Sequence, residues 1–295
     1  MNNTATATST ASPPSADLAF RLHCLNRDCF ALAMMKYRDF QGYLITGPHS
    51  GTHWVKWMLS HAMAYHYGLQ PPRYFNNASM ASNDFIGHPK LPRMYPELPR
   101  IATSHSVPPY PMQWGWLRSS LKLPPYAVVV RDIRKVLISN YEKWQEKYGV
   151  PFSEYVKGDP RSNRYICDAW FYTRFLNRWG EVATRYPNET LVLRYEDFRT
   201  DAATGLDRLN RFFKLPLTAD DIAAGVAAGA KDFMAKHHDP AVSAKALRPD
   251  GQGNTEFSPE DHAVLKDILQ RNLKHDFGYK YLDQPRGFQA AVGGT

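Results

Sequence analysis

The chain has few cysteines and no long run of apolar residues. Its three cysteines, Cys24, Cys29 and Cys167, are scattered, and no pair has the C-x-x-C spacing of a metal or redox site. Three such thiols cannot form a disulfide framework, so we expect a reducing, cytoplasmic environment. The longest apolar runs, such as residues 30–35, are far too short to cross a bilayer, so we expect a soluble protein.

The N-terminal segment lacks the positive charge and the apolar stretch of a secretory signal, and it is rich in Thr, Ser, Ala and Pro. We predict a disordered tail over residues 1–17 and one folded domain over residues 18–295. Acidic residues are in the minority, with 28 Asp and Glu against 36 Lys and Arg, a formal net charge of +8. Such a surface attracts anionic partners, whether nucleotides, nucleic acids or phosphorylated and sulfated metabolites.

Short apolar runs alternate with helical patterns along the chain. The runs are residues 42–46, 126–130 and 190–194, and the helical patterns cover about residues 52–67, 132–147, 164–186, 202–213 and 258–274. This alternation predicts an α/β domain with a parallel sheet and helices on both of its faces. Three irregular stretches, residues 70–100, 149–163 and 231–253, are either binding loops or surface decoration.

The turn at residues 47–52, Gly-Pro-His-Ser-Gly-Thr, joins the first run to the first helical pattern. Backbone N–H groups and the helix dipole at such a turn can hold an anion. It is not a Walker A loop, because the G-x-x-x-x-G-K-[ST] spacing and its lysine are missing. From these residues alone, a plain strand-to-helix turn without a ligand is an equal alternative.

The turn resembles the 5′-phosphosulfate-binding loop, P-K-S-G-T-T-W, of the PAPS-dependent sulfotransferases. The matching residues are Pro48, His49, Ser50, Gly51, Thr52, His53 and Trp54. Residues 131–139 resemble the family's 3′-phosphate motif, in which an arginine at a strand end and a serine eight residues later hold the phosphate. Here these are Arg131 and Ser139. A guanidinium fork suits a phosphate, and two helical turns return the serine to the same edge.

Further segments resemble the family in the same order. Tyr195 begins a Y-E-D segment whose tyrosine lies near the adenine, and Arg248 and Gly253 resemble the R-K-G-x-x-G loop over the 3′-phosphate. Residues 277–279 resemble its closing L-G-Y. The resemblance therefore covers residues 43–279. It implies a single-domain, P-loop-like three-layer α/β/α fold with a central parallel sheet of about five strands.

Residues 99–105 resemble P-R-x-x-K-T-H, the segment that carries the family's catalytic histidine, so we expect His105 to be the base. His49 and Thr103 replace two family lysines. We hypothesise that His49, flanked by the phosphates of the nucleotide, has a raised pKa and acts as an imidazolium in the place of the lysine, with His53 as a helper, so that activity falls at high pH. His49 and His53 could also chelate a metal, but no acidic third ligand is near in sequence, so we predict none. Trp54 could stack on the adenine or belong to the core.

The resemblance implies in-line transfer of a sulfuryl group from PAPS to a hydroxyl or amine of a small-molecule, carbohydrate or lipid acceptor. The product would be 3′-phosphoadenosine-5′-phosphate (PAP), without a covalent enzyme intermediate. An ATP-dependent small-molecule kinase on a related fold is the alternative, and only Asp132, as a Mg²⁺ ligand, favours it. A nucleic-acid-binding protein is a third possibility, but the basic residues do not form a stripe with aromatics.

Overall fold

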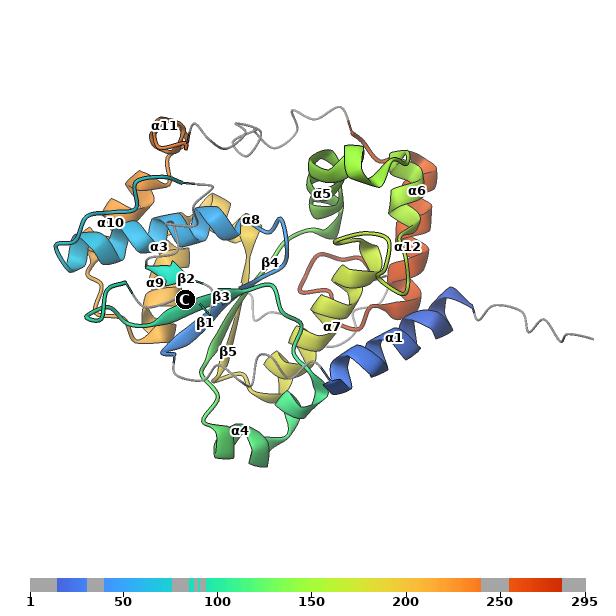
Figure 1. Ribbon diagram of the computed structural model, residues 1–295, viewed down its shortest axis with the longest axis horizontal. Helices are drawn as coiled ribbons and strands as arrows, with labels where there is room; N and C mark the ends of the chain where they lie inside the picture. Colours follow the sequence, from blue (N-terminus) through green and yellow to red (C-terminus); the bar gives the residue numbers. More distant parts are fainter. Residues whose placement is uncertain are drawn as a thin grey trace, which may run out of the picture.

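The computed structural model describes residues 15–30, 40–75, 85–87, 90, 94–239 and 255–282. Its centre is one five-stranded sheet with the strand order β2-β3-β1-β4-β5 (Figure 1). The strands are β1 (Gly42–Thr46), β2 (Ile86–Gly87), β3 (Ile101–Ser104), β4 (Tyr126–Val130) and β5 (Thr190–Arg194). All neighbouring strands pair in parallel, which confirms the predicted sheet.

Helices cover both faces of this sheet. They are α1 (Ala16–Phe30), α3 (Thr52–His66), α4 (Gly115–Leu121), α5 (Ile133–Tyr148), α6 (Phe152–Lys157), α7 (Ala169–Arg185), α8 (Tyr195–Thr200), α9 (Ala202–Phe213), α10 (Ala219–Ala228), α11 (Lys231–Lys236) and α12 (Pro259–Asn272), with a 3₁₀ turn, η2, at Tyr110–Gln113. In Figure 1, α3, α9 and α10 lie on one side of the sheet and α5, α7 and α12 on the other.

Alternate side chains of the strands point into two separate cores. Tyr43, Ile45 and Val128 belong to the core shared with α5, α7 and α12. Leu44 and Val129 belong to the core shared with α3, α9 and α10. A strand that is buried on both faces appears in sequence as an unbroken apolar run, which is why β1 and β4 were recognisable.

The position of β1 explains where a ligand can bind. The chain adds β2 and β3 on one side of β1, and β4 and β5 on the other. In open α/β sheets, ligands bind at the carboxyl ends of the strands, beside the strand where the order reverses. The segments that follow β1, β3 and β4 therefore meet at the natural site of this fold.

Several element boundaries differ from the sequence predictions. The long helix begins at Ala169 instead of residue 164, because the Asp168 side chain caps it by accepting from the Phe171 N–H at 2.9 Å. Helix α1 begins at Ala16, so residues 16 and 17, which we assigned to the tail, are helical. The final helix is confirmed: Ser258 caps it and a proline occupies its first turn. The two-residue β2 lies in the irregular stretch 70–100, and α6 and α11 lie in the other two.

Candidate active site

The turn between β1 and α3 has an unusual backbone. His49 has φ 61° and Gly51 has φ 84°, both in the left-handed region. A Cβ on Gly51 would lie 2.3 Å from the Tyr195 ring, so only glycine fits this position. The turn is thus shaped by close contact with Tyr195, the residue expected beside the adenine.

Two side chains from other elements hold this turn. Arg131, at the end of β4, donates from Nη1 to the His49 carbonyl at 2.8 Å, and its guanidinium lies over the Tyr195 ring at 4.6 Å. Tyr172 of α7 donates its hydroxyl to the Pro48 carbonyl. Three predicted site residues, Arg131, His49 and Tyr195, are therefore in contact, although they are far apart in sequence. Tyr172 carries no motif, and the sequence analysis missed it.

Helix α5 brings Ser139 to the same turn. The Ser139 Oγ lies 3.2 Å from His49 Nδ1. Asp132 starts the helix by accepting from the Arg134 N–H at 2.9 Å, and the eight residues from Arg131 to Ser139 span about two turns. The geometry predicted for the arginine–serine pair, both at one edge of the site, is therefore present.

Trp54 connects α3 to the end of α10. Its indole Nε1 donates to the Gly229 carbonyl at 3.0 Å, and its ring meets the Tyr195 ring edge-on at 5.9 Å between centroids. The same ring packs against both hydrophobic clusters on the α3 side of the sheet. Trp54 is thus part of the packing and also a neighbour of Tyr195, so the two alternatives considered from sequence are compatible.

His105 follows β3 and points back to β1. Its Nδ1 lies 2.8 Å from the Thr46 carbonyl and 3.2 Å from the Thr46 hydroxyl. A carbonyl only accepts hydrogen bonds, so Nδ1 carries the proton and Nε2 keeps its lone pair. Desolvation by the surrounding chain lowers the pKa of His105, and Lys143 and Lys56 lower it further against the bond to Thr46. The imidazole is therefore neutral at pH 7 and can accept a proton at Nε2.

In the structure the pKa of His49 lies below its ordinary value, and the raised pKa that we expect beside a bound nucleotide stays a prediction. Burial lowers the pKa of His49 to about 4, and the cationic Lys143 and Arg131 act in the same direction. The pKa of His53 also falls to about 4, first through desolvation and then through Lys56 and Lys143. Desolvation and positive neighbours both disfavour a further positive charge on these two imidazoles in the structure, although the His53 side chain is exposed.

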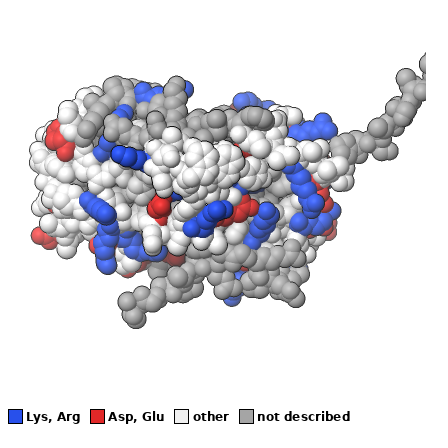
Figure 2. Space-filling view, turned by 90° about the horizontal axis from the view of Figure 1, so that it is seen from below, with Lys and Arg blue, Asp and Glu red and all other residues white. Residues whose placement is uncertain are grey.

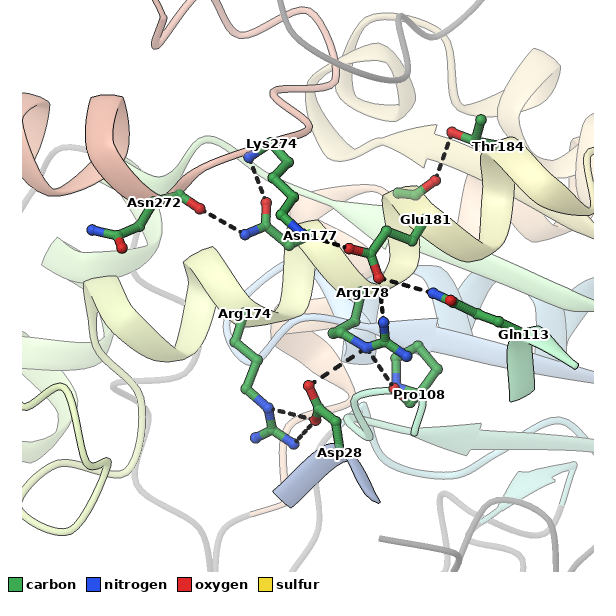
Figure 3. Close-up of polar contacts among 11 residues, drawn as sticks. Asp28, Pro108, Gln113, Arg174, Asn177, Arg178, Glu181, Thr184, Asn272 and Lys274 are labelled. Atoms are coloured by element: carbon green, nitrogen blue, oxygen red, sulfur yellow. Dashed lines mark hydrogen bonds and ion pairs between the residues drawn. The ribbon is translucent and has the colours of Figure 1, made fainter. Parts of the chain in front are cut away.

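The segment that follows His105 is held by α7. Trp179 donates from Nε1 to the Ser106 carbonyl at 3.0 Å, and Arg178 donates from Nε to the Pro108 carbonyl at 3.1 Å. Figure 3 shows how this contact continues to α1, where Asp28 accepts from Arg174 at 2.8 Å and lies 3.5 Å from Arg178 Nε. The segment that follows His105 is thus connected through α7 to an ion-pair network that reaches α1.

Several predicted features remain outside this geometry. Arg248 and Gly253 lie outside the described residues. Among the residues that the structure does describe, no group of three or more His, Cys, Asp or Glu is arranged to hold a metal ion. Asp132, the residue that favoured a kinase, instead pairs with Arg134 at 2.7 Å and accepts from the Tyr281 hydroxyl at 3.1 Å. Within the same described residues, no helix has both the length and the apolar character to cross a membrane.

Comparisons with known proteins agree with the motifs. The profile of the sulfotransferase domain matches residues 41–238. A flavonol sulfotransferase-like protein of Flaveria bidentis is 23% identical over 199 residues, covering 62% of this chain and 60% of that protein. Sulfotransferase 2A6 of Mus musculus is 28% identical over 134 residues, covering 43% and 42% respectively. The chain thus spans about half the length of the curated relatives it matches.

Solved structures share the fold. Mouse sulfotransferase SULT7A1, complexed with PAP, superposes with a TM-score of 0.54 at 12% identity, covering 86% of this chain and 90% of that one. Retinol dehydratase in complex with androsterone and the inactive cofactor PAP gives 0.51 at 13% identity, covering 90% and 95%. These likenesses confirm the P-loop-like α/β architecture with its five-stranded parallel sheet. With the profile match over most of its length, the chain belongs to the sulfotransferase domain family.

Proposed function

We propose that the protein transfers a sulfuryl group from PAPS to a hydroxyl or amine of a small-molecule, carbohydrate or lipid acceptor. One observation carries this proposal: the turn at residues 48–54, Arg131, Ser139 and Tyr195 converge at the carboxyl edge of the sheet. Arg131 bonds the His49 carbonyl and covers the Tyr195 ring, and Ser139 contacts the His49 imidazole. Two structures with the same fold are described as complexes with PAP.

Each donor group has a suitable partner in this arrangement. Arg131 and Ser139 would bind the 3′-phosphate, where a planar guanidinium can form two parallel hydrogen bonds to phosphate oxygens. The backbone N–H groups of the turn, at the N-terminus of α3, would bind the 5′-phosphosulfate. Tyr195 and Trp54 would contact the adenine. Arg248 and Gly253 remain predicted ligands of the 3′-phosphate.

His105 is the proposed base. The acceptor oxygen or nitrogen attacks sulfur from the side opposite the departing nucleotide, and its proton moves to Nε2 of His105. The bond between sulfur and the bridging oxygen breaks at the same time, and that oxygen keeps the electron pair as part of PAP. The Thr46 carbonyl, 2.8 Å from Nδ1, orients the ring and stabilises the imidazolium that forms.

Other observations support the acceptor class and the cellular location of the protein. Retinol dehydratase, which shares this fold, was solved in complex with androsterone. This complex supports a small, hydroxyl-bearing acceptor. We keep carbohydrates and lipids as acceptor classes because the irregular stretches of the sequence carry both polar and aromatic residues. A cytoplasmic location is supported by the three cysteines, all of which are unpaired thiols in the structure.

Calorimetric titration with PAP tests the donor site without knowledge of the acceptor. We expect the wild-type protein to bind PAP and Arg131→Ala to bind it more weakly, while ATP with Mg²⁺ binds poorly. Lys135→Ala is a matched control, because Lys135 is an exposed cation near the start of α5, four residues after Arg131. Binding of ATP and Mg²⁺ alone would instead favour the kinase, and binding of neither would refute the proposal.

The two alternative functions are less well supported by the geometry. A kinase would need Asp132 to hold Mg²⁺, but its carboxylate caps α5 and pairs with Arg134. A nucleic-acid-binding protein would need a continuous basic surface. On the face shown in Figure 2, Lys and Arg side chains are separated by uncharged and acidic residues.

A further inference from the structure

Two lysines lie on the helices that border the proposed active site. Lys56 lies three residues after His53 on α3 and has only 5% of its surface exposed, which is rare for lysine. Lys143 lies four residues after Ser139 on α5. Side chains three or four residues apart lie on one face of a helix. Lys56 therefore shares a face with His53, and Lys143 shares one with the serine that contacts His49.

The positive charges of these lysines affect the pKa values of the site histidines. Lys143 lowers the pKa of His49, His53 and His105, and Lys56 lowers the pKa of the last two. Arg131 also lowers that of His49. The charged side chains that shift these three pKa values most are all cationic. Lys56, Lys143 and Arg131 therefore all add positive charge to the surroundings of these imidazoles.

These positive charges are relevant because the turn has no lysine. As sulfur leaves, negative charge grows on the bridging oxygen, and a nearby cation stabilises it. The turn at residues 48–54 contains no lysine or arginine that could supply that charge. A lysine can supply it from a neighbouring helix, because its ammonium is a compact charge on a long, flexible stem.

We propose that Lys56 and Lys143 contact the 5′-phosphosulfate of the donor and neutralise the charge that develops on the departing oxygen. This inference rests on the proposed function, because it assigns two further ligands to the same donor. In this proposal, lysines of α3 and α5 supply the positive charge that the turn lacks. Desolvation lowers the pKa of His105 most, and the same two lysines lower it further, which favours its role as the base.

Binding of two nucleotides distinguishes a direct contact with the 5′-phosphate from a general effect of the lysines on the structure of the site. PAP carries both phosphates, whereas adenosine 3′-phosphate lacks the 5′-phosphate that the lysines are proposed to contact. In calorimetry, Lys143→Met and Lys56→Met should each raise the Kd for PAP roughly 10- to 100-fold, as for the loss of a hydrogen bond to a charged group. Their Kd for adenosine 3′-phosphate should stay unchanged, whereas Arg131→Ala should weaken both nucleotides.

The chain offers a matched control for Lys143. Lys147 lies one turn further along α5, and both ammonium groups lie near the Trp144 ring, at 5.3 Å for Lys143 and 5.5 Å for Lys147. Lys147→Met should leave both affinities unchanged. Lys143 is exposed, so its variant should fold even if burial makes Lys56→Met unstable.

Histidine titration by NMR supplies a second readout that needs no acceptor. The groups that act on His105 are Lys143 of α5 and Lys56 of α3, with the Thr46 carbonyl bonded to its ring. Removing either cation should raise the pKa of His105, and Lys147→Met should not. Wild-type binding of PAP with no loss in the Lys143 and Lys56 variants would overturn this inference and leave the proposed function intact. Absence of wild-type PAP binding would refute the proposed function itself.

Discussion

Substitution of Gly51 by alanine should damage the donor site more than any comparable change at a surface turn. Gly51 has φ 84°, and an added Cβ would lie 2.3 Å from the Tyr195 ring. The left-handed backbone costs a non-glycine residue about 1–2 kcal/mol. Overpacking against the ring adds about 1–3 kcal/mol, so we expect a loss of roughly 2–5 kcal/mol in the free energy of unfolding.

Gly68 provides the control at the other end of the same helix. Its φ is 63°, and a Cβ there would have no atom within 4 Å. Gly68→Ala therefore tests the backbone cost alone, about 1–2 kcal/mol. Urea unfolding would give both free energies, and titration with PAP would show whether the displaced Tyr195 ring also weakens the nucleotide. Equal destabilisation by the two substitutions, with unchanged PAP affinity for Gly51→Ala, would refute the reasoning.

Three further predictions follow from single contacts. Sulfuryl transfer should be lost as the pH falls below the pKa of His105, because protonated Nε2 cannot accept a proton. This pKa is lowered and lies under 6.5, and a rate that increases towards acid pH would contradict the prediction. Tyr172→Phe removes the hydrogen bond to the Pro48 carbonyl and should cost about 1 kcal/mol of stability in urea unfolding, together with some PAP affinity. Arg174→Met leaves the buried Asp28 carboxylate with one partner fewer and should cost about 3 kcal/mol, whereas a change within 0.5 kcal/mol would show that this ion pair is not needed.

Sequence patterns predicted the elements whose signals are local. Strands β1, β4 and β5 are apolar runs, and α12 has a serine cap and a proline at its start. Several other elements were missed, among them helices α1 and α10 and strands β2 and β3. Strand β3 has only four residues, Ile101–Ser104, and two of them are only partly buried, so its pattern cannot be distinguished from an extended loop.

The motifs also predicted most of the residues that meet at the site. Arg131, Ser139, Tyr195 and the turn at residues 48–54 come together as their order after successive parallel strands requires. Tyr172 could not be found in this way, because its contact with Pro48 joins residues 124 positions apart. Such a contact depends on how α7 packs on the sheet, which no local pattern encodes.

The sequence by itself determined the alternation of strands and helices, the glycine turn and the absence of its lysine, because these depend on residue type and spacing. Only the tertiary structure decided the charge state of the histidines. The sequence led us to expect an imidazolium at His49 beside the nucleotide phosphates, whereas in the structure burial and the cations Lys143 and Arg131 lower its pKa to about 4. A pKa is set by solvent exclusion and by charges that arrive from other elements, so no local sequence pattern determines it.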